Sequence, residues 1–277
     1  MKLVFEDSPF YQLRVNLNTA EEVYKAAIYG ALHNETTILQ ILGKTGLESS
    51  EQTLEKTKYK RAIAALNALA EKEKIITLDV TKNQMKLIRN AVKMQLKVVR
   101  NVPLLAREQL VITYATLVEG FVNDIIRNFF IQFPQSLKSN KSTLKDSQLI
   151  DSIIEGNTLE KLIENRVREI MYDSITGWIN YLNDKGLNIN EEKNLKEMFL
   201  VRNVLIHNNK KVGAELANGI GNNRYILGNK VNVTESDIKR FKVAIEIVTK
   251  SINVEYQKKI SNKTATNKSI AASGAGR

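Results

Sequence analysis

Residues 104–133 read LLAREQLVITYATLVEGFVNDIIRNFFIQF, and this stretch decides the fold class. Its apolar side chains recur at spacings of three and four residues, which places them along one side of an α-helix. The stretch is long and is followed by Pro134, so it predicts a long helix whose apolar seam packs against other helices. The seam positions are Val111, Tyr114, Val118, Phe121 and Ile125.

The sequence on either side also predicts helices. Thr19 and Glu22 have the spacing of a capping box, Thr234 is a second N-cap with Asp237 in the first turn, and Pro103 marks the end of one helix. The expected helices cover residues 20–32, 37–43, 49–72, 82–99, 104–133, 149–154, 159–182, 191–206 and 235–258.

Few segments favour other structure. Residues 1–18 look extended or irregular, and 136–146 are polar enough for an exposed loop. Residues 75–80 predict a short strand, and residues 225–233 predict a small hairpin that turns at Gly228-Asn229.

We therefore expect a mostly α protein in which a helical bundle with a small β-hairpin follows an N-terminal helical unit with one short strand. The expected domains are residues 1–100 and 104–260. A tail at 261–277, rich in Asn, Lys, Thr, Ser, Ala and Gly, predicts disorder.

Composition narrows the class of protein. Of 277 residues, 43% are hydrophobic and 26% are charged, as in a soluble globular protein. No apolar run is long enough to span a bilayer, and the N-terminus lacks the features of a signal peptide, so we expect a cytoplasmic protein. The absence of cysteine excludes disulfides, thiolate zinc sites and cysteine nucleophiles.

The formal net charge is +11, from 41 Lys and Arg against 30 Asp and Glu. Such an excess favours a polyanionic partner, such as nucleic acid, an anionic membrane surface or an acidic protein. The charge is spread along the predicted helices and the tail, so an ordinary solvated surface explains it equally well.

Arg202 and His207 are the strongest candidates for chemistry. Arg202 falls on the apolar stripe of its predicted helix together with Leu195, Phe199 and Ile206, where a permanent charge needs a partner, a wet cleft or an anionic ligand. His207, one of only two histidines, follows at the helix end and can transfer protons near neutral pH. The alternative is structural, with Arg202 paired to a carboxylate and His207 on the surface.

The residues around this pair, 197–209 (EMFLVRNVLIHNN), resemble the signature of the HEPN superfamily, an Arg followed by a polar residue and then, after a short spacing, a His at a helix end. In this chain the spacing is Arg-x4-His, and Asn203 occupies the polar position of the signature. The resemblance extends over residues 104–256, and residues 1–100 lie outside it.

The resemblance implies a helical bundle that dimerises, so that two Arg/His pairs share one cleft. Many members are metal-independent endoribonucleases of toxin–antitoxin, abortive-infection or CRISPR-linked defence, without a cofactor. In that case His207 is the general base or acid, Arg202 stabilises the pentavalent phosphorus, and Asn203 positions one of them. Glu119 is an orienting acid or a surface ion pair. Asn208, Asn209, Lys210 and Lys211 are weaker candidates for RNA binding.

The expected partners are then RNA, a second copy of the chain, and an antitoxin or another defence protein. Other members are inactive adaptors, so an inactive adaptor, an antitoxin or a nucleic-acid-binding regulator is the alternative function. Two distant histidines without cysteine make a metal site unexpected, and no glycine-rich phosphate loop is present.

Three further features of the sequence can be interpreted without a catalytic role. Residues 37–80 resemble a winged helix-turn-helix, but Glu51 and Glu55 would face the DNA phosphates, so a helical accessory or dimerisation unit is the alternative. His33 suits a capping or solvent-exposed role, and Trp178 suits the core.

Overall fold

The computed structural model describes residues 8–44, 82–137, 156–221 and 224–274, and this part of the chain is mostly helical, as predicted. Its elements are α1 (Pro9–Lys44), α3 (Lys82–Gln132), the 3₁₀ turn η2 (Pro134–Leu137), α5 (Thr158–Met171), α6 (Ile175–Asp184), α7 (Glu192–His207), α8 (Ala214–Gly219) and α9 (Glu235–Gly274).

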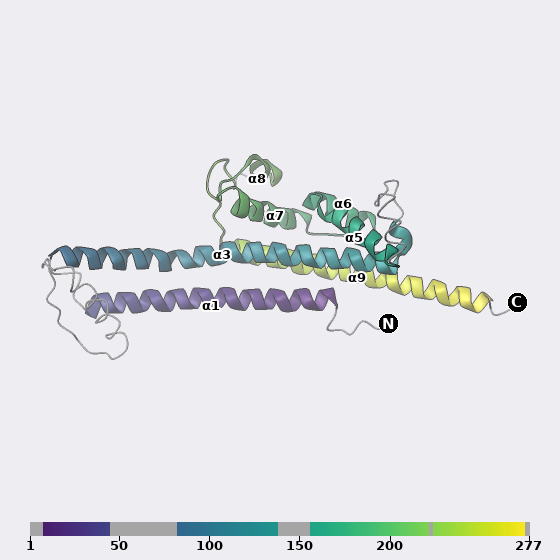
Figure 1. Cartoon of the computed structure of the whole chain (residues 1–277), viewed down its shortest axis with the longest axis horizontal. Coiled ribbons are helices and arrows are strands. Elements are labelled where there is room, and N and C mark those ends of the chain that lie inside the picture. The colour runs from purple at the N-terminus through teal and green to yellow at the C-terminus, as the bar shows by residue number, and fades with distance from the viewer. Residues whose placement is uncertain (1–7, 45–81, 138–155, 222–223, 275–277) are drawn as a thin grey trace. The chain divides into compact units, whose positions relative to one another are not determined.

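Contacts divide the chain into two units, residues 1–20 with 108–277, and residues 21–107. In the smaller unit, the parts of α1 and α3 that belong to it run antiparallel (Figure 1). Ile88 and Ala31 are buried there, and Arg100 Nε donates to Glu35 Oε1 at 2.6 Å. The ion pair between Arg100 and Glu35 therefore joins these two helices.

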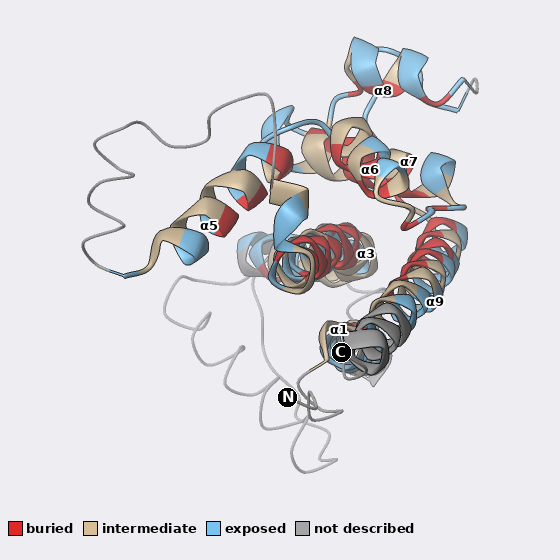
Figure 2. Cartoon of the chain, turned by 90° about the vertical axis from the view of Figure 1, so that its right-hand side faces the viewer, coloured by how far each residue is buried: buried red, intermediate tan, exposed pale blue. Residues whose placement is uncertain are grey.

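In the larger unit, α5, α6, α7 and α8 lie on one side of α3 and α9 (Figure 1). The seam predicted in α3 is confirmed, because all five of its side chains are buried (Figure 2). Phe10, in the first turn of α1, packs edge-on against Phe121 of α3 and lies 6.5 Å from the ring of Tyr256 in α9. Aromatic packing thus joins three helices.

Helix α7 is central to this unit and confirms the helix predicted at 191–206. It packs against α6, α8 and α9, and five consecutive residues, 197–201, are all buried. Five consecutive residues cover every side of a helix, so neighbours enclose α7 over this stretch. Its C-terminal half, which carries Arg202 and Asn203, is therefore held in place on several sides.

Two predictions about helix ends are wrong. Helix α1 already begins at Pro9 and continues without a break to Lys44. Proline is tolerated in the first turn, where its missing N–H has no helical acceptor. Thr19 is therefore no cap, and its hydroxyl donates to the carbonyl of Val15 within the helix at 3.0 Å.

Pro103 does not end a helix, because α3 runs through it from Lys82 to Gln132. An internal proline removes one backbone hydrogen bond and crowds the carbonyl four residues earlier, at a cost of about 3 kcal/mol. The buried seam from Leu110 onward offsets that local cost.

The single helix predicted over 159–182 is instead two, α5 and α6. Ser174 interrupts it in an extended conformation, and its hydroxyl accepts a hydrogen bond from the backbone N–H of Gly177 at 3.2 Å. An N-cap serine satisfies one of the free N–H groups at a helix start. The new start turns α6 toward α7.

The hairpin predicted at 225–233 is not seen, and the described residues contain no strand. One isolated bridge pairs Lys211 with Lys230, and Gly228 takes a positive φ of 81° in a turn. Backbone hydrogen bonds join residues 228–231 to residues 210–212, and Tyr225 and Arg224 contact carboxylates of α7 and α9.

The cap predicted at Thr234 is confirmed. Asp237 N–H donates to Thr234 Oγ1 at 3.3 Å, and Thr234 N–H donates to Asp237 Oδ2 at 2.9 Å. Helix α9 continues beyond residue 261, where composition predicts the start of a disordered tail. Lys263 Nζ donates to the carbonyl of Gln132, which ties this end of α9 to the end of α3.

The helix predicted at 49–72, the strand at 75–80, the helix at 149–154 and most of the polar loop lie outside the described residues. None of the helices in the described ranges combines the length and the apolar character that a bilayer span requires.

Candidate functional site

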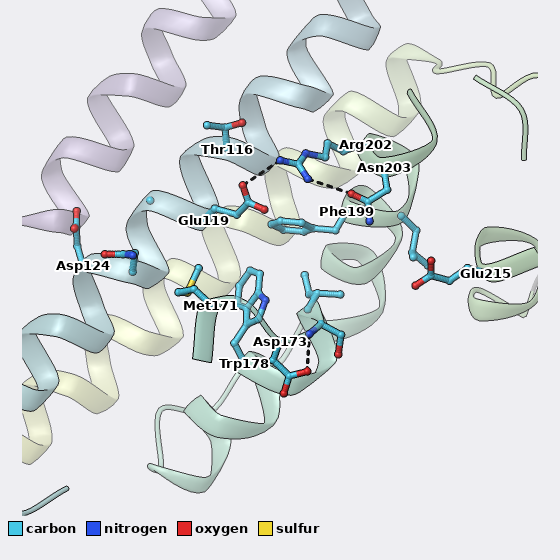
Figure 3. Close-up of a pocket in the computed structure, with 15 residues that line it drawn as sticks. Thr116, Glu119, Asp124, Met171, Asp173, Trp178, Phe199, Arg202, Asn203 and Glu215 are labelled. Atoms are coloured by element: carbon cyan, nitrogen blue, oxygen red, sulfur yellow. Dashed lines mark hydrogen bonds and ion pairs between the residues drawn. The ribbon is translucent and has the colours of Figure 1, made fainter. Parts of the chain in front are cut away.

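A cleft of about 680 Å³ opens between α3, α6, α7 and α8 in the larger unit (Figure 3). Its polar lining comes from helices far apart in the sequence, so only the folded chain assembles it. The polar side chains are those of Thr116, Glu119, Asn123, Asp124, Asp173, Ser174, Arg202, Asn203 and Glu215.

Arg202 is the single cation among the lining residues, and two side chains hold its guanidinium (Figure 3). Nη1 donates to Asn203 Oδ1 at 3.1 Å, and Nη2 donates to Glu119 Oε2 at 3.3 Å. The Arg202 side chain is 23% exposed, and its Nε is buried without a hydrogen-bond acceptor among the described residues. The guanidinium is thus fixed in place and retains donor capacity.

Trp178 and Phe199 form an apolar part of the cleft lining. Their rings meet edge to face, with centroids 5.2 Å apart and an interplanar angle of 84°. Both are buried, so the prediction that Trp178 belongs to the core is confirmed. This contact fixes α6 against α7 beside Arg202.

The cleft has an acidic lining. Glu119, Asp124, Asp173 and Glu215 face one arginine. Burial raises the pKa of Asp124, and the charge of Arg127 opposes that shift. This surplus of carboxylates opposes the entry of an anionic group, because like charges repel.

His207 is the last residue of α7 and is exposed, and it is not among the lining residues. Five helical residues at roughly 100° each place its side chain roughly 140° around α7 from Arg202. Within one chain, the structure therefore brings Arg202, Asn203 and Glu119 together and leaves His207 apart.

The four residues after His207 form a tight turn. Asn209 and Lys210 have positive φ angles of 48° and 63°, and Lys210 N–H donates to the carbonyl of Val204 at 3.2 Å. Lys210 Nζ forms an ion pair with the buried Glu108 of α3. Asn208, Asn209 and Lys211 are exposed beside His207, outside the cleft. The ion pair anchors the turn that follows His207.

The sequence analysis did not predict an ion network that joins α7 to α9 and to the segment before α9. Glu197 is 1% exposed, and it accepts hydrogen bonds from Arg240 Nη2 at 2.8 Å and from the Tyr225 hydroxyl at 2.6 Å. Asp237, also buried, pairs with Arg240 and Arg224. A signal was present, since Glu197 directly precedes the apolar run 198–201 on the same helix, and a carboxylate that is buried there needs cations from elsewhere in the fold.

Burial and hydrogen bonding oppose each other in this network. Burial favours a higher pKa for Glu197, but hydrogen bonds from Arg240 and Tyr225 outweigh it and lower that pKa. Burial likewise favours a higher pKa for Asp237. Hydrogen bonds from Arg224, Thr234 and Arg240 outweigh burial and lower that pKa to about 2. Burial and the bond to Glu197 both raise the pKa of Tyr225. Both carboxylates therefore stay ionised at neutral pH.

In the described part of the chain, no three His, Asp or Glu side chains gather into a group that could hold a metal ion. His33 lies exposed on α1, in the smaller unit. We compared the chain with protein-family models, with curated proteins and with solved structures, and none of them matches.

Proposed function

We propose that this chain is a metal-independent endoribonuclease of the HEPN type that acts as a homodimer, as a toxin or an anti-phage effector. The observation that carries the proposal is the fixed guanidinium of Arg202 in an open cleft, on the same helix that ends at the exposed His207. The resemblance of residues 197–209 to the HEPN signature supports the same function.

RNA cleavage in this proposal needs only the side chains of His207 and Arg202, the RNA itself and water. The imidazole of His207 accepts the proton of a 2′-hydroxyl, and O2′ attacks the adjacent phosphorus as the bond from phosphorus to O5′ breaks. Arg202 stabilises the negative charge on the pentavalent phosphorus, and Asn203 and Glu119 keep its guanidinium in place. The 5′-oxygen takes up a proton from water, and the other fragment ends in a 2′,3′-cyclic phosphate.

The directions in which Arg202 and His207 project from α7 are the reason why we propose a second protomer. Arg202 and His207 project from α7 in directions roughly 140° apart, and we therefore propose that each site takes its arginine and its histidine from different protomers. A two-fold axis near the C-terminal end of α7 would bring the arginine of one protomer to the histidine of the other. The active site then belongs to the dimer.

The test is cleavage of a labelled single-stranded RNA in excess EDTA. We expect the wild-type chain to leave 2′,3′-cyclic phosphate ends, and we expect His207→Ala and Arg202→Ala to abolish cleavage. His33→Ala and Arg14→Ala are the matched controls, because both residues are exposed on α1. Cleavage that both site variants retain would refute the proposal.

One observation favours a second function, that of an inactive adaptor, an antitoxin or a nucleic-acid-binding regulator. Four carboxylates line the cleft around Arg202, and they oppose the entry of a polyanion. In that case the chain binds a partner, or binds nucleic acid outside this cleft, without cutting it. Binding that is indifferent to His207→Ala, with no strand scission, would identify this function.

A further inference from the structure

A second groove continues the cleft along α3 and α5. It has a volume of about 430 Å³ and shares Asn123 and Met171 with the cleft that holds Arg202. Its other lining residues are Arg127, Glu164, Val167, Arg168 and Tyr172. Because the two hollows share side chains, one extended ligand can occupy both.

The charge of this groove is opposite to that of the cleft. Arg127 and Arg168 face one carboxylate, Glu164. Arg127 Nη2 is already engaged by Glu160 at 3.2 Å and Glu164 at 3.3 Å. Arg168 is exposed, and no described residue forms an ion pair with it. Its charge is therefore available to a ligand.

An exposed aromatic ring lies beside that charge. Tyr172 follows the last residue of α5 and is 84% exposed, one helical turn beyond Arg168. Side chains four residues apart on a helix are neighbours. A phenol ring next to a free guanidinium offers two flat surfaces and a positive charge, and these are the features with which proteins hold unpaired bases and their phosphates.

We infer that Tyr172 and Arg168 bind a single-stranded RNA beside the cleavage site, with one base stacked on Tyr172 and a phosphate paired with Arg168. The inference rests on the proposed function for the choice of RNA. The segment bound here is the part of the strand that extends beyond the acidic cleft. Asn123, which lines both hollows, lies where the strand passes from one to the other.

The experiment measures binding apart from cleavage. All variants are made in the His207→Ala background, and a fluorescein-labelled single-stranded 12-mer RNA is titrated in EDTA by fluorescence anisotropy. We expect Tyr172→Ala to weaken binding on the order of tenfold, and Tyr172→Phe to bind like the parent because it keeps the ring. We expect Arg168→Ala to lower the slope of log K against log salt by about 0.7.

Tyr29→Ala is the matched control, because Tyr29 is 70% exposed on α1 and lies outside the groove. An unchanged affinity for Tyr172→Ala would overturn the inference. So would an equal loss for Tyr29→Ala, a Tyr172→Phe variant as weak as Tyr172→Ala, or a duplex of the same sequence that binds with the same dependence on Tyr172.

Failure of this inference and failure of the proposed function give different results. If the wild-type chain cuts no RNA but binding still depends on Tyr172, the nuclease proposal fails and the groove stands. If the chain cuts RNA and Tyr172→Ala changes neither binding nor cleavage, the groove fails and the nuclease proposal stands. A DNA 12-mer of the same sequence shows whether the 2′-hydroxyl contributes to binding.

Discussion

Arg240 in α9 donates to both carboxylate oxygens of Glu197 in α7, and the bond from Nη2 to Oε1 is 2.8 Å long. Glu197, the α7 member of this bidentate pair, lies on the same helix as Arg202, between one and two turns earlier. Tyr225 and Arg224 add contacts from the segment before α9. The pair therefore supports the helix that presents the candidate site.

The first prediction concerns the stability that Glu197 provides. Glu197→Gln keeps the shape of the side chain but removes one of the two buried carboxylates that pair with Arg240, and breaking such a buried pair costs about 3 kcal/mol. We expect the free energy of unfolding in urea to fall by that amount. Glu192→Gln, on the exposed side of the same helix, should change it by less than about 0.5 kcal/mol. Equal effects of the two changes would contradict the prediction.

The second prediction concerns acid. The folded pKa of Asp237 is about 2, below its ordinary value of 3.8, so the unfolded chain binds a proton there more readily than the folded chain does. The stability from ionised Asp237 is fully present above about pH 4 and is lost as the pH falls toward 2. We expect Asp237→Asn to make the free energy of unfolding less dependent on pH in this window.

The measurement is urea unfolding at several pH values between 2 and 6. Asp184→Asn is the matched control, because Asp184 is exposed at the end of α6. If Asp237→Asn and the wild type lose stability in parallel across the window, the network does not act as described.

Local pattern predicted much of the larger unit. The seam of α3, the extent of α7 and the cap at Thr234 follow from spacing and residue type alone, because each depends on neighbours within a few residues. The same kind of reasoning singled out Arg202, since a charge on an apolar stripe is visible without any structure.

What pattern could not predict depends on contacts between distant residues. Glu119 lies 83 residues from Arg202, and Glu197 meets Arg240 across 43 residues. The local cost of Pro103 predicts a helix end, whereas α3 continues through it from Lys82 to Gln132. The turn residues of 225–233 predict a hairpin, whereas the backbone of residues 228–231 bonds to residues 210–212, and Tyr225 bonds to Glu197 of α7.

The third prediction concerns Glu119 and rests on the proposed nuclease function. Glu119→Gln removes the charge that holds Nη2 of Arg202, so Asn203 alone of the two remains to fix the guanidinium through its usual bond. We expect kcat for RNA cleavage to fall on the order of tenfold, because misplacement of a charge-stabilising group slows the chemical step. We expect KM to stay constant or to fall, because a negative charge near the phosphate is removed.

Glu215→Gln is the matched control, because Glu215 lines the same cleft from α8. It should lower KM without lowering kcat. A kcat for Glu119→Gln equal to that of the wild type would show that Arg202 does not need this partner.

The fourth prediction tests whether the active site is shared between protomers. Arg202→Ala and His207→Ala chains are each expected to be inactive, but they are unfolded and refolded together so that mixed dimers form. If each site takes its arginine from one protomer and its histidine from the other, a mixed dimer has one intact site and one that lacks both groups. Random pairing then makes half of the dimers mixed, so activity should return to about a quarter of the wild-type value.

The assay is RNA cleavage in EDTA by the mixture, with each variant refolded alone as the control and the dimer measured by light scattering. If Arg202 and His207 of the same chain acted on one phosphate, every site in a mixed dimer would lack one of the two groups, and the mixture would stay inactive. A wild-type chain that cleaves RNA as a monomer would exclude the shared site directly. Recovery by mixing therefore distinguishes a composite site from two sites that each take both groups from one chain.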